Sequence, residues 1–126
     1  MERVGQQFSK SDRILKRDVF RRVYEHGEKV HGRYFTAFVL DSDSDTLRIG
    51  LTVTRKIGNS VVRNRCRRLL REAFRRHRSV AEGVGADLVV NAKRQLVTAT
   101  YAEVEDDLLR FLTRLKRSRR GLQGDS

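Results

Sequence analysis

The segment from Arg55 to Arg78 constrains this chain most strongly, because it joins a helical apolar stripe to a densely cationic face. Its apolar residues recur with the period of one face of an α-helix. They are Val62, Cys66, Leu69, Leu70 and Ala73. Gly58 and Asn59 precede this stripe, and an Asn side chain can accept a hydrogen bond from the free amides of a first helical turn. The segment is therefore predicted to form an amphipathic helix that begins near Asn59.

The polar face of this predicted helix carries almost only positive charge. The segment contains ten Lys or Arg residues and a single acid, Glu72. The face presents Asn64, Arg67, Arg68, Arg71 and Arg75, with Arg65 and Arg76 at its edge. Solvated helix faces usually mix charges of both signs. A face of one sign repels itself unless a polyanion neutralises it, so the pattern favours contact with nucleic acid.

The charge of the whole chain also indicates a polyanionic partner. The formal net charge is +12 and the isoelectric point is about 11.0 over 126 residues, a length that suits one domain. A membrane surface is the other candidate polyanion, but the chain shows no long apolar segment, apolar signal region or lipidation signal. We therefore expect a cytoplasmic protein without a membrane partner. Cys66 is the only cysteine and is expected to be a small core residue.

Two further helices are predicted on either side of the basic segment. The first runs from about Lys16 to Glu25, with Gly27 as its C-terminal cap. The other follows a capping box formed by Thr100 and Glu103. Its apolar stripe is Tyr101, Val104, Leu108, Phe111 and Leu115. Residues 1–126 are expected to form one domain, with flexible tails at about 1–9 and 118–126.

Three segments have the composition of β-strands, and together with the helices they indicate an α+β fold with one sheet. Residues 34–40 and 47–54 alternate in hydrophobicity around a turn of Asp and Ser, which predicts an antiparallel hairpin. Residues 86–92 hold a continuous apolar run, as inner strands do. The alternation places Tyr34, Thr36, Phe38 and Leu40 on one face. Phe20 and Tyr24 of the first helix fit either core packing or ligand contact by their spacing alone.

No constellation for protein-based catalysis is visible in the sequence. The histidines His26, His31 and His77 do not form a zinc motif, and there is no phosphate-binding loop or nucleophile elbow. The turn that starts at Asp41 resembles the start of a calcium loop, but Thr46 stands where that loop needs Gly. We therefore expect no catalytic residue, no metal and no cofactor in the protein itself.

The basic segment resembles the signature of the bacterial ribonuclease P protein subunit. The resemblance is carried by Arg63-Asn64-Arg65, the basic pair Arg67-Arg68 and the string Arg71-Glu72-Ala73-Phe74. It extends to Arg13-Ile14-Leu15, Asp18-Val19-Phe20, Val23-Tyr24, Gly27, the strand Leu47 to Leu51 and the strand Leu88 to Val90, and so spans roughly residues 10–115.

The resemblance implies a fold and a function. The fold would have the order α-β-β-β-α-β-α, one mainly antiparallel sheet with helices packed on it, and a left-handed β-α-β crossover around the basic helix. General rules for such crossovers would predict a right-handed one. The protein would be the accessory subunit of an endoribonuclease that removes the 5′ leader of precursor tRNA. Its partners would be the catalytic RNA subunit and precursor tRNA, and the RNA with its Mg²⁺ ions would perform the hydrolysis.

The resemblance also assigns residues to the two RNA partners. The residues expected to contact the catalytic RNA are Arg55, Lys56, Arg63, Asn64, Arg65, Arg67, Arg68 and Arg71. Those expected to contact the leader are Phe20, Tyr24, Phe38, Thr52 and Thr54. Cationic side chains bind phosphates and aromatic rings stack on bases, and both tolerate any sequence. The alternatives are a ribosomal or other structural RNA-binding protein and an architectural DNA binder. The Arg-Asn-Arg signature favours the ribonuclease P subunit over both alternatives, so no DNA partner is expected.

Overall fold

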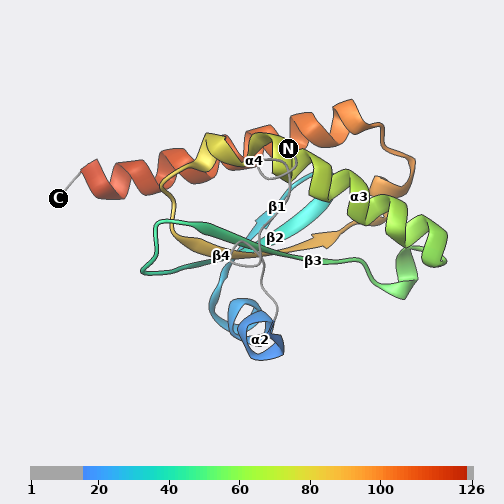
Figure 1. The fold of residues 1–126 in the computed structure, drawn as a ribbon, viewed down its shortest axis with the longest axis horizontal. Helices are drawn as coiled ribbons and strands as arrows, with labels where there is room; N and C mark the ends of the chain where they lie inside the picture. The colour runs from blue at the N-terminus through green and yellow to red at the C-terminus, as the bar shows by residue number, and fades with distance from the viewer. Residues whose placement is uncertain (1–15, 125–126) are drawn as a thin grey trace, which may run out of the picture.

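The computed structural model describes residues 16–124, with side chains described through Arg119. Its helices and strands follow the predicted order (Figure 1). They are α2 (Arg17–His26), β1 (Glu28–His31), β2 (Phe35–Asp41), β3 (Leu47–Thr52), α3 (Ser60–His77), β4 (Ala86–Ala92) and α4 (Tyr101–Gly124). Short 3-10 helices cover Arg55–Ile57, Arg78–Ala81 and Arg94–Thr98. The α-β-β-β-α-β-α order and the α+β class are therefore confirmed.

The four strands form one mixed sheet in the order β1-β2-β4-β3. β2 pairs antiparallel with β1 and β4, whereas β3 pairs parallel with β4. The predicted hairpin between residues 34–40 and 47–54 is therefore wrong, because β4 lies between β2 and β3. β4 takes this central place because its apolar residues are buried on both faces of the sheet. The left hand of the β3-α3-β4 crossover stays a prediction.

The turn of residues 42–46 carries the chain over the beginning of β4. Asp41 at the end of β2 and Leu47 at the start of β3 both lie opposite Ala86. The amide of Ser42 donates to the carbonyl of Gly85 at 3.0 Å, and the amide of Ala86 donates to the carbonyl of Thr46 at 3.2 Å. A Cβ atom on Gly85 would lie 1.6 Å from the carbonyl oxygen of Ser44, so the crossing needs glycine.

The helices cover the two faces of the sheet unequally. α3 and α4 lie on one face and α2 lies on the other (Figure 1). The larger core, between the sheet and α3 with α4, includes Phe35, Leu88, Leu70, Phe74 and Leu108, all fully buried. The smaller core beneath α2 contains Val19, Val23 and Val89, with Phe20, Phe38 and Leu40 packed against it. The two sets of strand residues thus follow the predicted alternation.

Tyr34 departs from the predicted face. β2 begins only at Phe35, and Tyr34 packs in the larger core with 6% of its surface exposed. Its amide donates to the carboxylate of Asp107 on α4 at 2.8 Å, as does the amide of Arg33 at 3.1 Å. Because α4 holds the turn before β2 in this way, Tyr34 leaves the alternation that Thr36 and Phe38 keep.

The predicted capping box at the start of α4 is confirmed. The Thr100 amide donates to Glu103 at 2.9 Å, and the Glu103 amide donates to the Thr100 hydroxyl at 3.2 Å. The helix then continues to Gly124, so the tail predicted from about residue 118 is helical as far as that residue. Arg119 fixes this part by an ion pair with Asp41 at 2.9 Å. The predicted tail at residues 1–9 lies outside the described residues.

Candidate nucleic-acid interface

The beginning of α3 is fixed by two side chains of the basic segment. Asn59 is the N-cap, and its side-chain oxygen accepts from the amide of Val62 at 3.0 Å, as the sequence predicted. The Nε of Arg63, the fourth residue of α3, donates to the carbonyl of Gly58 at 3.1 Å. The helix therefore starts at a defined place, and the direction of each later side chain follows from the helical period.

The apolar stripe of α3 faces the core, as predicted. Cys66, Leu70 and Ala73 are fully buried, Val62 and Leu69 are half-buried, and Phe74 joins them although it was not assigned to the stripe. Burial raises the pKa of the Cys66 thiol, which keeps it in the neutral form. Anchoring one face of α3 in this way leaves the opposite face to the solvent.

The cationic residues of this surface fall into two classes. Arg55, Lys56, Arg68 and Arg71 are exposed and bind no partner within the described residues. The others bind within the protein: Arg67 donates to Asn64 at 2.9 Å, Arg76 donates to Glu72 at 3.2 Å, and Arg75 also pairs with Glu72. The four without partners are the residues most available to a polyanion. We call the exposed side of α3, together with the 3-10 helix Arg55–Ile57 before it, the basic surface, and these four residues its free cations.

Arg65 has a role inside the protein that its place at the edge of the helix did not reveal. Its guanidinium donates to the backbone carbonyls of Val97 at 2.8 Å and of Ala99 at 3.2 Å. These carbonyls lie in the connection between β4 and α4. Arg65 therefore ties the start of α3 to that connection.

We expect Arg65→Ala to lower the stability of the free protein. The substitution leaves two backbone carbonyls without their charged donor, a loss of about 1–3 kcal/mol. Thermal unfolding followed by circular dichroism checks this, with Arg68→Ala as the control, because Arg68 lies on the same helix and binds nothing within residues 16–119. Arg65→Ala should melt several degrees below Arg68→Ala, and equal melting temperatures would refute the structural role.

A second surface lies where α2 meets the sheet, and four of the five predicted leader residues gather there. The rings of Tyr24 and Phe38 meet edge to face, with centroids 4.9 Å apart and planes at 78°. The Tyr24 hydroxyl lies 3.4 Å from the hydroxyl of Thr52. Phe20 lies against Gly50, where a Cβ atom would approach its ring to 2.5 Å. We call Phe20, Tyr24, Phe38 and Thr52 the aromatic face.

The structure separates Thr54 from this group and adds two residues that the sequence did not single out. Thr54 follows β3, is exposed, and precedes the 3-10 helix at Arg55. Asn91 of β4 accepts a hydrogen bond from the Tyr24 hydroxyl at 2.8 Å. The Nζ of Lys29 lies 5.7 Å from the centre of the Phe38 ring. Both could have been found only from the register, which pairs Lys29 with Phe38 and places Asn91 between Thr36 and Thr52.

One cation near this surface is neutralised within the sheet. Arg48 of β3 donates to both carboxylate oxygens of Asp87 at 2.8 Å, and the Asp87 side chain is only 7% exposed. This hydrogen bonding raises the pKa of Arg48 above its ordinary value. The pair therefore holds its two charges together, and the positive charge near α2 comes from the exposed residues Arg17, Arg21 and Arg22.

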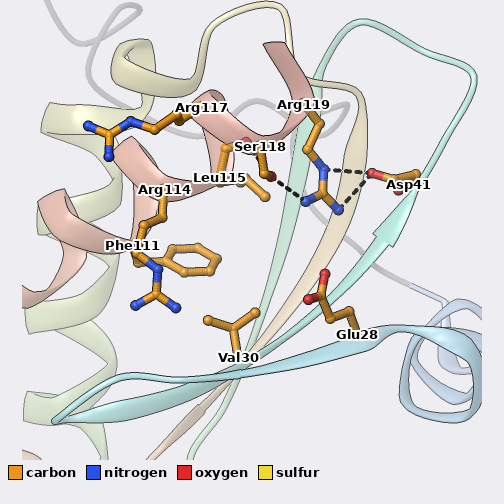
Figure 2. A pocket seen from close by; sticks show the side chains of 9 residues that line it. All are labelled: Glu28, Val30, Asp41, Phe111, Arg114, Leu115, Arg117, Ser118 and Arg119. Carbon is orange, nitrogen blue, oxygen red and sulfur yellow. Dashed lines mark hydrogen bonds and ion pairs between the residues drawn. The ribbon is translucent and has the colours of Figure 1, made fainter. Parts of the chain in front are cut away.

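A groove of about 660 Å³ lies on the opposite side of the molecule, between β1 and α4 (Figure 2). Its apolar floor is formed by Val30, Phe111 and Leu115, and Arg119 bridges Asp41 and Ser118 at its end. None of the predicted RNA-contacting residues lines it.

No group of three or more His, Cys, Asp or Glu residues in the described part of the chain could hold a metal ion. No helix there is long and apolar enough to cross a membrane.

Comparison with known proteins assigns the family. The sequence model of the ribonuclease P family matches residues 8–116. A ribonuclease P protein component of Syntrophus aciditrophicus is 41% identical over 105 residues, which cover 83% of this chain and 87% of the relative. That of Desulfovibrio desulfuricans is 43% identical over 109 residues, covering 83% of each.

Solved structures agree with this assignment. The ribonuclease P protein from Thermotoga maritima has a TM-score of 0.74 at 30% identity, covering 81% of this chain and 96% of the other. That from Staphylococcus aureus has a TM-score of 0.70 at 32% identity, covering 79% and 90%. The alternative of a ribosomal or other structural RNA-binding protein is not favoured. The basic surface, the fold and the sequence thus agree that the chain belongs to the ribonuclease P protein family.

Proposed function

We propose that this chain binds the catalytic RNA of ribonuclease P through the basic surface of α3 and holds the 5′ leader of precursor tRNA on the aromatic face. The observation that carries the proposal is the set of free cations. The side chains of Arg68 and Arg71 on the exposed side of α3, and of Arg55 and Lys56 in the 3-10 helix before it, have no partner among the described residues. Such cations bind phosphates without reading sequence, because they displace the counterions of the RNA.

Around the free cations lie the remaining residues that we assign to catalytic RNA, which are Arg63, Asn64, Arg65 and Arg67. Arg63, Arg65 and Arg67 each use some of their guanidinium N–H groups for hydrogen bonds within the protein. A guanidinium has five N–H donors, so such a contact leaves donors for phosphate and also fixes the direction of the side chain. We therefore propose that these residues orient the basic surface toward the RNA. The free cations would provide most of the affinity that depends on salt concentration.

The aromatic face is suited to a single strand of RNA. Phe20, Tyr24 and Phe38 offer rings on which unpaired bases can stack, and Thr52 offers a hydroxyl at the end of β3 beside them. Thr54 follows β3 and offers a further exposed hydroxyl outside the aromatic face. The exposed Arg17, Arg21 and Arg22 of α2 add positive charge beside the rings. Stacking with electrostatic attraction holds single strands of varied sequence, which a processing enzyme with many substrates requires.

These two surfaces indicate which roles belong to the protein and which to the RNA. The protein is the accessory subunit of a ribonucleoprotein endoribonuclease, and we assign the hydrolysis of the leader bond to the RNA and its Mg²⁺ ions. The protein supplies binding of both RNA partners, and we place this activity in the cytoplasm. Family membership supports this assignment together with the surfaces themselves.

Replacing Arg68 and Arg71 together with Ala tests the basic surface. The double variant should bind the catalytic RNA more weakly at low salt, and the plot of log K against log salt concentration should flatten by roughly 0.7–0.9 for each lost phosphate contact. The fold should be kept, because neither side chain binds within residues 16–119. Titration of labelled RNA over a series of salt concentrations measures both quantities.

A double variant of α4 with the same loss of charge controls for net charge. Arg110 and Arg114 are exposed and lie on the helix that carries none of the assigned residues. Arg110→Ala with Arg114→Ala should leave the salt dependence close to that of the parent protein. A slope for the α3 variant that matches the parent, or equal slopes for the two variants, would show that α3 does not bind RNA phosphates.

A further inference from the structure

Asn91 stands at the centre of the aromatic face without being aromatic or charged. It lies on β4, the central strand, with Thr36 of β2 opposite it on one side and Thr52 of β3 on the other. Its side-chain oxygen lies 2.8 Å from the Tyr24 hydroxyl, while the Thr52 hydroxyl lies 3.4 Å from the same atom. Asn91 is half-buried, and the Tyr24 side chain that reaches down to it leaves 38% of its residue surface exposed.

The arrangement of protons follows from the donors available. A phenol has one proton, and the oxygen of an amide can only accept, so the short contact places the Tyr24 proton on the bond to Asn91. The Thr52 hydroxyl, at 3.4 Å, is a second and weaker acceptor for the same phenol proton. Tyr24 is in this way held at its far end by two strands of the sheet.

This bond fixes a ring that α2 would otherwise leave free to turn. Tyr24 is the last aromatic residue of α2 and lies in its exposed part, so packing alone restrains it weakly. Its ring meets Phe38 at 78° with centroids 4.9 Å apart, a geometry that requires a particular side-chain angle at Tyr24. Anchoring the hydroxyl to the rigid central strand selects that angle before any ligand is present.

We propose that Asn91 is a positioning residue, whose amide oxygen holds Tyr24 edge-on against Phe38 and so preorganises the aromatic face for single-stranded RNA. The inference rests on the proposed function of that face, which it deepens by naming the group that aligns the ring. A ring that is aligned in advance loses less conformational freedom on binding, and this difference appears as affinity.

A double-mutant cycle tests the proposal in the particle reconstituted with the catalytic RNA. The variants are Asn91→Leu, which keeps a similar volume but cannot accept the bond, Tyr24→Phe, which removes the bond from the other end, and the two together. The measured quantity is the affinity for leader-bearing precursor tRNA divided by the affinity for mature tRNA. Each single variant should lower this ratio roughly 3- to 10-fold, the effect of one hydrogen bond. The double variant should lower it no further, because both changes break the same bond.

A readout without RNA keeps the test independent of the leader. In the free protein, nuclear Overhauser contacts between the rings of Tyr24 and Phe38 should weaken in Asn91→Leu, whereas a merely space-filling Asn91 would leave them unchanged. Tyr24→Phe gives the same information if Asn91→Leu does not fold, since it leaves β4 intact.

Tyr24→Ala separates this inference from the proposed function. If Tyr24→Ala lowers the ratio but Asn91→Leu does not, the leader site stands and the positioning role of Asn91 is refuted. Additive losses in the double variant refute it as well. If Tyr24→Ala leaves the ratio unchanged, the leader does not bind on this face, and the inference fails together with the proposed site.

Discussion

Replacing Phe38 with Ala is expected to weaken binding of leader-bearing precursor tRNA by about one to two orders of magnitude, while binding of mature tRNA changes little. Stacking on an aromatic ring is worth roughly 1–3 kcal/mol per base, and only the precursor carries unpaired leader bases. Phe38 lies on β2 and contacts both the ring of Tyr24 and the ammonium of Lys29, so its loss removes a stacking ring and the contacts that both groups make with it. The affinities of the reconstituted particle for the two RNAs measure the effect.

Phe38 also packs against the smaller core, so the same variant is expected to lose stability. Val89→Ala is the control, because Val89 is fully buried in that core and presents no surface to RNA. The control should lower the melting temperature and leave the ratio of precursor to mature affinity unchanged. A constant ratio for Phe38→Ala as well, with only a lower melting temperature, would assign Phe38 to the core and exclude it from the leader site.

Most helices and strands of this fold could be predicted from the sequence because each depends on a local pattern, whereas the short strand β1 followed only from the order that the family resemblance implied. The stripe of α3, the capping box of α4 and the continuous apolar run of β4 are read within a few residues of one another. The pairing of strands depends on distant segments instead. Residues 42–46 have the composition of a hairpin turn, but the turn crosses over β4, whose two buried faces give it the central position.

The same distinction explains what was missed in the candidate site. A helical period places Arg65 at the edge of α3, but it does not show that the guanidinium reaches the carbonyls of Val97 and Ala99. In the sequence, Asn91 is only a polar residue after the apolar run of β4. The parallel register with β3 places it beside Thr52, where it accepts a hydrogen bond from Tyr24. Tyr34 left its predicted face because Asp107 of α4 binds the turn before it. Each case requires contacts between elements that are distant in sequence.

The protein and the RNA are expected to have separate roles in the cleavage reaction. If the protein contributes binding and the RNA contributes chemistry, the isolated chain has no cleavage activity to lose, and removing the RNA abolishes the reaction completely. Variants of the aromatic face and of the basic surface should then change how precursor tRNA and the catalytic RNA are bound, and Phe38→Ala should affect cleavage most at limiting precursor concentration.

Cleavage of precursor tRNA in the presence of Mg²⁺ by three matched samples tests this account most directly. The samples are the protein freed of RNA by denaturing purification and refolding, the same protein treated with the catalytic RNA, and that mixture after digestion of the RNA before substrate is added. We expect removal of the 5′ leader only in the second sample. Removal of the leader by the first sample, once shown to be free of RNA, would contradict the account, because the protein itself would then perform the hydrolysis.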